Sequence, residues 1–403
     1  MDNTVPPEVE ELAARTREFV REVVIPVEQQ VAGVMHDASD DLRRSLQKQA
    51  TDAGLLAPHV PKEWGGCGLD VRGQAVVFEA AGYSLLGPLA LNCSAPDEGN
   101  MHLLEVVASD EQKQKYLRPL AAGEIRSCFA MTEPAPGAGS DPAALRTTAA
   151  KVAGGWRISG EKHLITGAQG AAFAIVMAAG ADGGEATMFL VDAGNPGFEI
   201  TGHARTIDSL SIGGHCQVRF ADAFVADDAV LGEPGEGFRY AQVRLAPARL
   251  THCMRWLGAA RRAHEIALAR SVSRSVFGAV LADHGMAQQM IADNEIELAA
   301  ARALLWHVAW QVARGDKSTE ASSRAKVFIS ETVSRVVDRA VQLCGGLGTS
   351  EEMVVGRIYA DVRAFRIYDG ASEVHRMSIA RRVARRARAD ARGDAPAGTR
   401  ADG

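Results

Sequence analysis

The sequence has few cysteines, few aromatic residues and no recognisable metal-binding motif. Six of the 403 residues are cysteine, and they are scattered along the chain without a C-x-x-C pair or the clustering of histidines that a zinc site needs. This spacing excludes the usual zinc motifs. It predicts buried thiols in a reducing compartment, and no metal site.

Long apolar runs and strong charge are also missing. No stretch of about 18 apolar residues occurs, and the chain opens with Asp2, Pro6 and Pro7 rather than a basic, apolar signal. Acidic residues number 50 and basic residues 44, which gives a net charge of −6 and no electrostatic reason for a nucleic-acid partner. We therefore expect a cytoplasmic protein that inserts in no membrane and binds no nucleic acid.

The composition is that of a globular chain, with 47% apolar and 23% charged residues, and the length allows more than one folding layer. Helical periodicity fills the first part of the sequence, up to about Leu120. Glycine and proline signals divide it, the clearest being the loop at 61–68. The helices predicted here are 8–30, 40–54, 71–86, 94–107 and 110–121.

The period changes between Ser127 and Leu231, where short β-prone runs are bounded by glycine and aspartate. These runs are 156–159, 173–177, 188–191 and 217–220. After Gly237 the helical period returns, with apolar residues every seven positions from Ile291 to Val312, and long helices of this kind form bundles. The predicted fold is mainly α with a central β domain. The predicted parts are an N-terminal helical domain (1–126), a middle β domain (127–234), a C-terminal helical bundle (235–387) and a disordered tail (388–403).

The segment 366–376 carries the candidate catalytic residue. It places the carboxylate of Asp369 beside Gly370 at the expected start of a helix. A carboxylate held there by apolar neighbours can remove a proton from a bound carbon acid. Asp-Gly is also an ordinary turn sequence, so the segment alone leaves both interpretations open.

Two further motifs lie in the predicted β domain. The stretch 128–134 leads to the Gly-rich stretch 137–141, where backbone N–H groups and Ser140 can face an anionic or heteroaromatic ligand. The stretch 160–168 places Thr166 at a strand end. A Gly-rich surface loop and a solvent-facing strand threonine are the alternatives.

The last motifs lie in the predicted bundle. Arg274 and Phe277 are three residues apart, which on one helix face suits pairing with a phosphate and covering an adenine. Gln342, Gly345 and Gly346 end another predicted helix, where glycine permits close backbone approach. A surface arginine, a core phenylalanine and a plain helix C-cap are the alternatives.

Together these stretches, with 342–346 and the Asp369 segment counted as one motif of four, resemble the acyl-CoA dehydrogenase family of flavoproteins over about residues 10–387. The resemblance implies an N-terminal helical domain, a β-barrel-like middle domain, a C-terminal four-helix bundle, and FAD as cofactor. Most members have glutamate as the catalytic base, whereas this sequence is similar to a subgroup with Asp-Gly-x-Ser-Glu-Val-His. In that subgroup the aspartate of this motif is the base, which implies that Asp369 is the base in this sequence.

The resemblance also assigns the cofactor contacts. Met131 and Thr132 match groups that hydrogen-bond the flavin ring, and Thr166 matches a group at the flavin nitrogen that receives hydride. Leu164 departs from the pattern, because the family usually has tryptophan there. The full set assigned to FAD is Phe129, Met131, Thr132, Ser140, Leu164, Thr166, Arg274, Phe277, His284, Gln342, Gly345, Gly346, Ala371 and Glu373. Because the groups at the adenosine end come from a neighbouring subunit in the family, a homo-oligomer is implied, a tetramer or a dimer.

The implied reaction is α,β-dehydrogenation of an acyl thioester, with an electron-transferring flavoprotein as the implied electron acceptor. The residues assigned to the substrate are Ser140, Arg249, Tyr368 and Gly370. Ala246 and Ala371 replace the family's polar residues, so an acyl-carrier thioester is an alternative to acyl-CoA. Alanine also stands at 248, where some members place the base, which leaves Asp369 as the candidate.

Two expectations concern Asp369 itself. Its solution pKa is about 4, so we expect burial against flavin and substrate, with Tyr368, Ile367 and Phe365 as walls, to raise its basicity. Aspartate is one methylene shorter than glutamate, so we expect an α-branched or otherwise bulky acyl group, including long or 2-methyl-branched chains.

Two other functions remain open from the sequence. Nitroalkane oxidases resemble the same family, bind FAD and use aspartate as the base for a carbon acid. A helical scaffold that keeps the fold without its chemistry is the non-enzymatic alternative.

Overall fold

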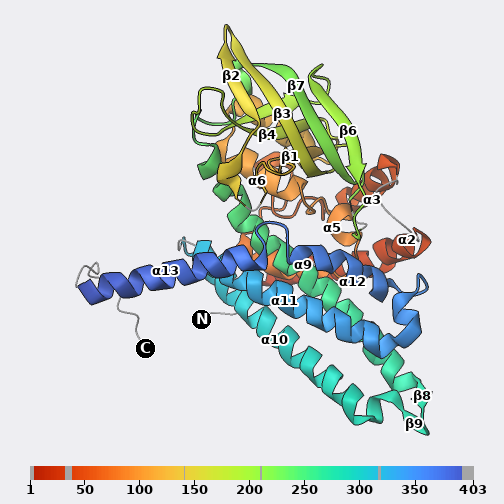
Figure 1. Ribbon diagram of the computed structural model, residues 1–403. Coiled ribbons are helices and arrows are strands. Elements are labelled where there is room, and N and C mark those ends of the chain that lie inside the picture. The colour runs from red at the N-terminus through yellow and green to blue at the C-terminus, as the bar shows by residue number, and fades with distance from the viewer. Residues whose placement is uncertain (1–3, 32–38, 140, 209–210, 316–318, 393–403) are drawn as a thin grey trace.

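The computed structural model describes residues 4–31, 39–139, 141–208, 211–315 and 319–392, and the described part runs from helices to strands to helices (Figure 1). The other first helices lie within three residues of the predicted ranges, but α4 ends at Ala81 rather than at residue 86, and the short helix Gly87–Ala90 was not predicted. The elements are α1 (Pro7–Phe19), continued by a π-helical turn (Val20–Val24) and α2 (Ile25–Gln30), then α3 (Asp40–Asp52), α4 (Val71–Ala81), α5 (Gly87–Ala90), α6 (Asp97–Val107), α7 (Asp110–Gln112), the π-helical turn Lys113–Leu117 and α8 (Arg118–Ala121).

A seven-stranded sheet follows, in the order β1-β4-β2-β3-β7-β6, with β5 paired to β4. Its strands are β1 (Ser127–Ala130), β2 (Thr148–Val152), β3 (Gly155–Thr166), β4 (Phe173–Gly180), β5 (Thr187–Asp192), β6 (Phe198–Ala204) and β7 (His215–Ala226). Strand β4 lies parallel to β1 and β2, whereas the other pairs are antiparallel. The register of β3 against β7 shifts between Lys162 and Ile165, which marks a bulge at the end of β3.

Strand β4 joins the sheet to the helices because both of its faces are buried. Phe173 and Ile175 belong to the core shared with the helices, whereas Ala174 and Val176 belong to a second core inside the β domain. A strand covered on both faces reads as a continuous apolar run, as 173–178 does.

The C-terminal part is a bundle of long helices, from which α13 extends away (Figure 1). Its helices are α9 (Gly237–Ser273), α10 (Gly285–Ala313), α11 (Thr319–Cys344), α12 (Val354–Phe365) and α13 (Ser372–Arg392). On α10, Leu298 and Leu305 of the predicted apolar repeat are buried. No helix in the described ranges is long and apolar enough to cross a membrane.

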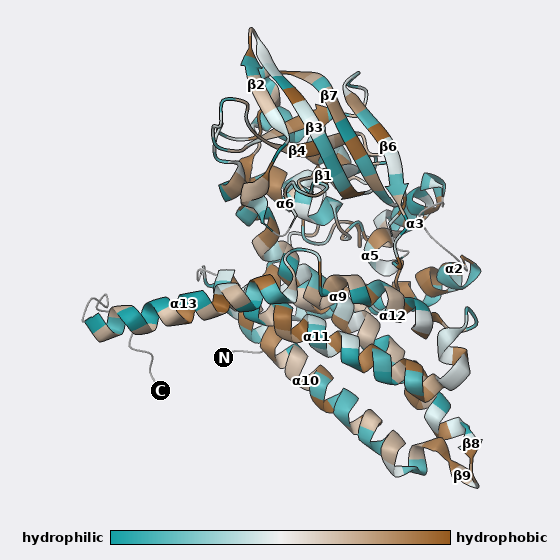
Figure 2. Ribbon diagram, in the orientation of Figure 1, coloured by the Kyte–Doolittle hydropathy of each residue, from teal (hydrophilic) through white to brown (hydrophobic). Residues whose placement is uncertain are grey.

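Helix α13 corrects the predicted tail. Residues 388–392 continue this helix, so the prediction of a disordered tail from 388 onward is wrong for them. The helix is exposed over most of its length and mainly hydrophilic in colour (Figure 2). Because it packs on the bundle near its start, Ser372 and His375 are its buried residues.

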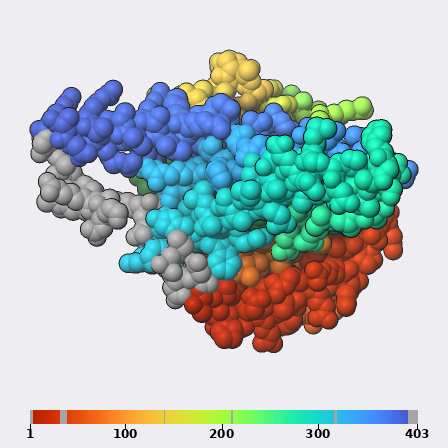
Figure 3. Space-filling model, turned by 90° about the horizontal axis from the view of Figure 1, so that it is seen from below, coloured from red at the N-terminus to blue at the C-terminus, as the bar shows by residue number. Residues whose placement is uncertain are grey.

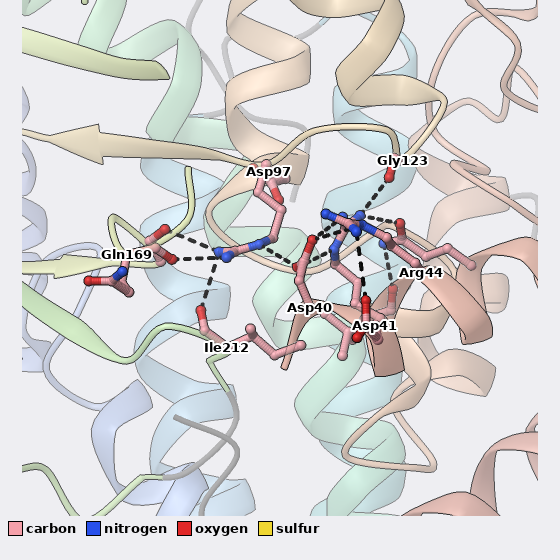
Figure 4. Close-up of polar contacts among 12 residues, drawn as sticks. Asp40, Asp41, Arg44, Asp97, Gly123, Gln169 and Ile212 are labelled. Atoms are coloured by element: carbon pink, nitrogen blue, oxygen red, sulfur yellow. Dashed lines mark hydrogen bonds and ion pairs between the residues drawn. The ribbon is translucent and has the colours of Figure 1, made fainter. Parts of the chain in front are cut away.

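Asp40 connects the N-terminal helices to the β domain (Figure 4). Its carboxylate accepts hydrogen bonds of 2.8 and 2.7 Å from Arg43 and one of 2.8 Å from Arg126. Arg126 also donates to the carbonyl oxygens of Gly167 and Gln169, at 3.1 and 2.9 Å. The loop that follows Thr166 is thereby fixed to helix α3.

This junction predicts a loss of stability in acid. The hydrogen bond and charge of Arg43, with a further contribution from Arg126, outweigh burial and lower the pKa of Asp40 to about 2, from an ordinary value of 3.8. A carboxyl group whose folded pKa is lowered contributes stability above its unfolded pKa, and this contribution is lost as pH falls towards the folded value. The contribution corresponds to about 2 kcal/mol. We expect Asp40→Asn to melt at a lower temperature than the wild type at pH 6, as measured by calorimetry. Between pH 5 and pH 2.5 the melting temperature of the variant should fall less than that of the wild type. An equal fall in both proteins would contradict this role of Asp40.

Candidate active site

Asp369 lies in the turn between α12 and α13, and three helices hold its backbone. Arg249 of α9 and His375 of α13 each donate a hydrogen bond of 3.1 Å to the carbonyl oxygen of Asp369. Lys326 of α11 donates one of 2.7 Å to the carbonyl oxygen of Gly370. The carboxylate therefore has a fixed position, as a catalytic group requires.

The glycine after Asp369 is needed for this turn. Asp369 and Gly370 have φ values of 53° and 93°, and aspartate tolerates such a conformation better than most residues do. A Cβ atom at Gly370 would lie 2.7 Å from Nε2 of His375. The Asp-Gly pair is thus a turn as well as the position of the candidate base.

The Asp369 side chain faces His252 of helix α9. Their side chains are 16% and 10% exposed, and Nε2 of His252 lies 3.4 Å from Oδ2 of Asp369. That distance is long for a hydrogen bond, and Oδ2 is buried without a hydrogen-bond partner in the described part of the chain. One carboxylate oxygen is therefore available to a substrate.

Neighbouring donors determine which nitrogen of His252 carries hydrogen. A guanidinium group can only donate, and that of Arg255 lies 3.1 Å from Nδ1 of His252. Nδ1 therefore accepts, and Nε2 carries the hydrogen that points to Asp369. Burial, followed by the charge of Arg255, lowers the pKa of His252, so the ring is a neutral donor.

The pKa of Asp369 is held below its ordinary value. Burial would raise it, but the hydrogen-bonding influence of His252 and the positive charges of Arg244 and Arg249 together outweigh burial. Within the chain, the cationic side of helix α9 therefore outweighs burial, a contribution that the sequence interpretation did not connect with Asp369. The expectation of raised basicity concerned burial against flavin and substrate, and it stays a prediction.

Two of the three predicted walls are in place. The ring of His252 lies 4.7 Å from that of Tyr368 and 5.8 Å from that of Phe365, and Trp256 donates a hydrogen bond of 2.6 Å to the Tyr368 hydroxyl. Ile367 is 60% exposed, so it adds little to the burial of Asp369 within the chain, and its role as a wall stays a prediction.

Residues predicted to contact the flavin ring gather at the ends of β1 and β3. The N–H of His163 donates to the carbonyl oxygen of Thr132 at 2.9 Å, which places Leu164 and Thr166 beside the stretch that follows β1. Leu164 sits in the bulge of β3 with a φ of 57°, and its side chain is 45% exposed. Met131 and Phe129 are half-buried. An exposed apolar side chain next to hydroxyl and backbone groups suits a flat heteroaromatic ring.

Thr166 is the first residue in a chain of hydrogen bonds. Its hydroxyl lies 2.9 Å from Nδ1 of His215, whose Nε2 lies 2.7 Å from the carboxylate of Asp208. Because the carboxylate accepts, Nε2 donates to it. When Nε2 alone carries hydrogen, Nδ1 accepts from the Thr166 hydroxyl. The Thr166 oxygen keeps lone pairs for another donor.

The adenosine-end residues lie at the other end of the bundle, where Figure 1 shows β8 and β9 far from the sheet. Arg274 and Phe277 do not share a helix face, so that interpretation is wrong. Helix α9 ends at Ser273, and β8 (Ser275–Val276) pairs with β9 (Ala279–Val280). Phe277 and Gly278 form the two-residue turn, both with positive φ, as hairpin turns of this length require.

The other residues assigned to the adenosine end lie near this hairpin or at the end of α11. Nε2 of His284 lies 3.0 Å from the carbonyl oxygen of Val276. Because a carbonyl oxygen can only accept, Nε2 donates this hydrogen bond. Gly345 follows the end of α11 with a φ of 64°, as a helix C-cap does. Gln342 and Gly346 are exposed. Arg270 of α9 donates to the carbonyl oxygen of Cys344, so the two clusters lie near each other.

Three assigned residues remain. Ala371 is half-buried and Glu373 is exposed in the first turn of α13, close to Asp369 along the chain. Ser140 lies outside the described residues. A cavity of about 30 Å³ lined by Val9, Ala75 and Trp306 contains none of the predicted site residues.

Sequence interpretation missed the roles of Arg244, His252 and Lys326. The available signal was spacing, because His252 and Arg255 follow Arg249 at three-residue steps on one helix. A buried cationic face on α9 could have been expected from that repeat. The carboxylate that this face contacts could not have been expected from the spacing.

The fold and this site define a three-part enzyme in which the helical bundle holds a buried carboxylate, and the residues predicted to contact a flavin gather at strand ends of the middle domain. Family models match the acyl-CoA dehydrogenase N-terminal domain over residues 6–124, the middle domain over 128–223 and the C-terminal domain over 235–384. The chain belongs to the acyl-CoA dehydrogenase family.

Individual relatives agree with this assignment. The chain is 35% identical to (R)-benzylsuccinyl-CoA dehydrogenase of Thauera aromatica, covering 84% of each protein. It is 32% identical to acyl-CoA dehydrogenase family member 11 of Gallus gallus, covering 92% of this chain but only 50% of that one. Butyryl-CoA dehydrogenase of Megasphaera elsdenii has the same fold, with a TM-score of 0.84, 26% identity and coverage of 95% of this chain and 100% of the other.

Proposed function

We propose that this oxidoreductase removes the α-proton of an acyl thioester with Asp369 while the β-hydride passes to FAD. The acyl-CoA dehydrogenase family is established by the matches above, whereas the binding of FAD and the role of each residue are part of this proposal. The observation that carries it is the Oδ2 atom of Asp369, which is buried and without a hydrogen-bond partner among the described residues. A free oxygen at a fixed position is what proton removal requires.

Each residue near Asp369 has a separate role in the proposed reaction. Asp369 takes the α-proton, and the Nε2–H of His252, which lies 3.4 Å from Oδ2, favours the ionised carboxylate electrostatically. The Asp369 N–H, which donates to no group in the described ranges, is available to the thioester oxygen, where negative charge develops. FAD supplies the acceptor for the β-hydride, and Thr132, Leu164 and Thr166 would hold its ring.

The acyl group is part of the same proposal. Because aspartate is shorter than glutamate, we propose that the substrate is α-branched or otherwise bulky near the α-carbon. Ala246 and Ala371 keep an acyl-carrier thioester as an alternative to acyl-CoA. Turnover of 2-methylacyl and straight-chain thioesters of equal length tests whether the substrate is α-branched, and a clear preference for straight chains would contradict the branching.

We further propose a homo-oligomer in which Arg274, Phe277, His284, Gln342, Gly345 and Gly346 serve the FAD of a neighbouring copy. Large apolar side chains at this end favour a covered surface, since Phe277 is fully exposed and Met286 and Ile296 of α10 are 79% and 66% exposed. Helix α10 lies open on the face seen in Figure 3. Sedimentation would show a dimer or tetramer.

The electron acceptor proposed is an electron-transferring flavoprotein, and the proposed domains are 1–126, 127–234 and 235–387.

The direct experiment is anaerobic mixing of the FAD-loaded protein with a panel of thioesters. The account expects the flavin absorbance to bleach with at least one acyl-CoA or acyl-carrier thioester. Faster oxygen consumption with nitroethane than with any thioester would instead favour a nitroalkane oxidase. A protein that takes up no FAD would favour the non-catalytic scaffold.

A further inference from the structure

Two buried arginines of α9 lie close to Asp369 without an acidic partner. Arg244 and Arg249 are 6% and 7% exposed, yet neither forms an ion pair within the described part of the chain. The other buried arginines of this helix do, since Arg255 pairs with Glu98 at 3.5 Å and Arg262 pairs with Glu28 at 2.5 Å. Buried charges are usually paired, so the two exceptions require an explanation.

Among the described residues, those that contact the Arg244 guanidinium are neutral. Its Nε donates to Oδ1 of Asn100 at 2.8 Å, and a terminal nitrogen donates to the carbonyl oxygen of Pro96 at 3.3 Å. The centre of its guanidinium lies 4.1 Å from the centroid of the Phe129 ring. Because a guanidinium has five N–H groups, these contacts orient it and leave donors free for a ligand.

The position of Arg244 relates it to the acyl chain. Phe129 belongs to the set assigned to the flavin, and the charge of Arg244 acts on Asp369, because it lowers the pKa of that carboxyl group. In the proposed reaction the α- and β-carbons lie between Asp369 and the flavin. Since Arg244 contacts Phe129 and its charge acts on Asp369, we place the acyl carbons beyond the β-carbon next to Arg244 as part of this inference.

We propose that Arg244 binds a carboxylate carried by the acyl chain, so that the substrate is the monothioester of a dicarboxylic acid. This inference rests on the proposed function, since it specifies the substrate of the same site. A planar guanidinium matches a carboxylate with two parallel hydrogen bonds. Binding an anion would also offset the positive charge of Arg244, so the same contact would make Asp369 a stronger base.

The test compares matched thioesters on two variants of Arg244. FAD-loaded Asp369→Asn is titrated calorimetrically with adipyl-CoA and hexanoyl-CoA, and with glutaryl-CoA and pentanoyl-CoA, so that binding is measured without turnover. We expect the dicarboxylic member of at least one pair to bind about ten- to a hundred-fold more tightly, the range of a charged hydrogen-bonded contact. Adding Arg244→Met should remove this preference, whereas Arg244→Lys should keep part of it. Arg239→Met, on the exposed face of the same helix, should leave it unchanged.

The outcomes separate this inference from the proposed function. Equal or tighter binding of the neutral thioester in both pairs would overturn the inference, even if hexanoyl-CoA bleaches the wild-type flavin. The same conclusion follows if Arg244→Met retains its FAD and the full carboxylate preference. If adipyl-CoA binds through Arg244 but no thioester bleaches the flavin, the inference survives and the proposed dehydrogenation fails.

Discussion

Asp369→Asn is expected to slow flavin bleaching by a thioester by about a hundred- to ten-thousand-fold, the usual contribution of a general base. The amide keeps the size of the side chain but does not accept the α-proton. The carbonyl groups of Asp369 and Gly370 hold the turn through Arg249, His375 and Lys326, and these are backbone contacts that the substitution retains. We therefore expect the variant to bind FAD as the wild type does. Stopped-flow absorbance under anaerobic conditions measures the rate.

Asp338→Asn is the matched control, because Asp338 is an exposed residue of α11. It should bleach at the wild-type rate. If Asp369→Asn retained both its FAD and more than a third of the wild-type rate, Asp369 would not be the base. His252→Gln, which keeps a donor but removes the ring, should fall between the two.

Lys162→Met is expected to cost about 3–5 kcal/mol of stability, since it leaves a buried charge without its partner. The side chains of Lys162 and Glu133 are 0% and 2% exposed and lie 2.9 Å apart. Lys162 also donates to the carbonyl oxygens of Met131 and Met177, at 3.1 and 2.8 Å, so each of its three donors has an acceptor. Burial would raise the pKa of Glu133, but hydrogen bonds from Thr147 and Lys162 and the charge of Lys162 lower it to about 2, so the carboxylate stays ionised.

The same substitution should reduce FAD binding, because Met131 belongs to the stretch proposed to contact the flavin ring. Calorimetry gives the change in melting temperature, and absorbance of the purified protein gives the FAD content. Lys151→Met is the control, since Lys151 and its partner Asp227 are 54% and 56% exposed, and exposed pairs contribute about 0–1 kcal/mol. Equal melting temperatures for the two variants would contradict the structural role of Lys162.

The order of helices and strands could be predicted because it depends on local periodicity. The run 173–177 was recognisable as a strand from its apolar residues, and β4 spans Phe173–Gly180. The Asp-Gly turn before α13 was also visible, because glycine is required where φ is positive. Each of these features depends on only a few consecutive residues of the sequence.

Features that depend on long-range packing could not be predicted. The hairpin of Phe277 and Gly278 interrupts helical periodicity without the Asn-Gly or Asp-Gly signal of such turns. The pKa of Asp369 depends on Arg244 and His252, which lie more than a hundred positions earlier in the chain. Sequence spacing shows that these residues share a helix but not which carboxylate they face.

The most direct test of the account is exchange of the α-hydrogen. A thioester whose β-position cannot lose hydride, such as a 3-thia-acyl-CoA, is incubated with the FAD-loaded protein in deuterated water and analysed by mass spectrometry. The account predicts deuterium at the α-carbon with the wild type and almost none with Asp369→Asn. Exchange at the same rate in both proteins would contradict the assignment of Asp369 as the group that removes the proton.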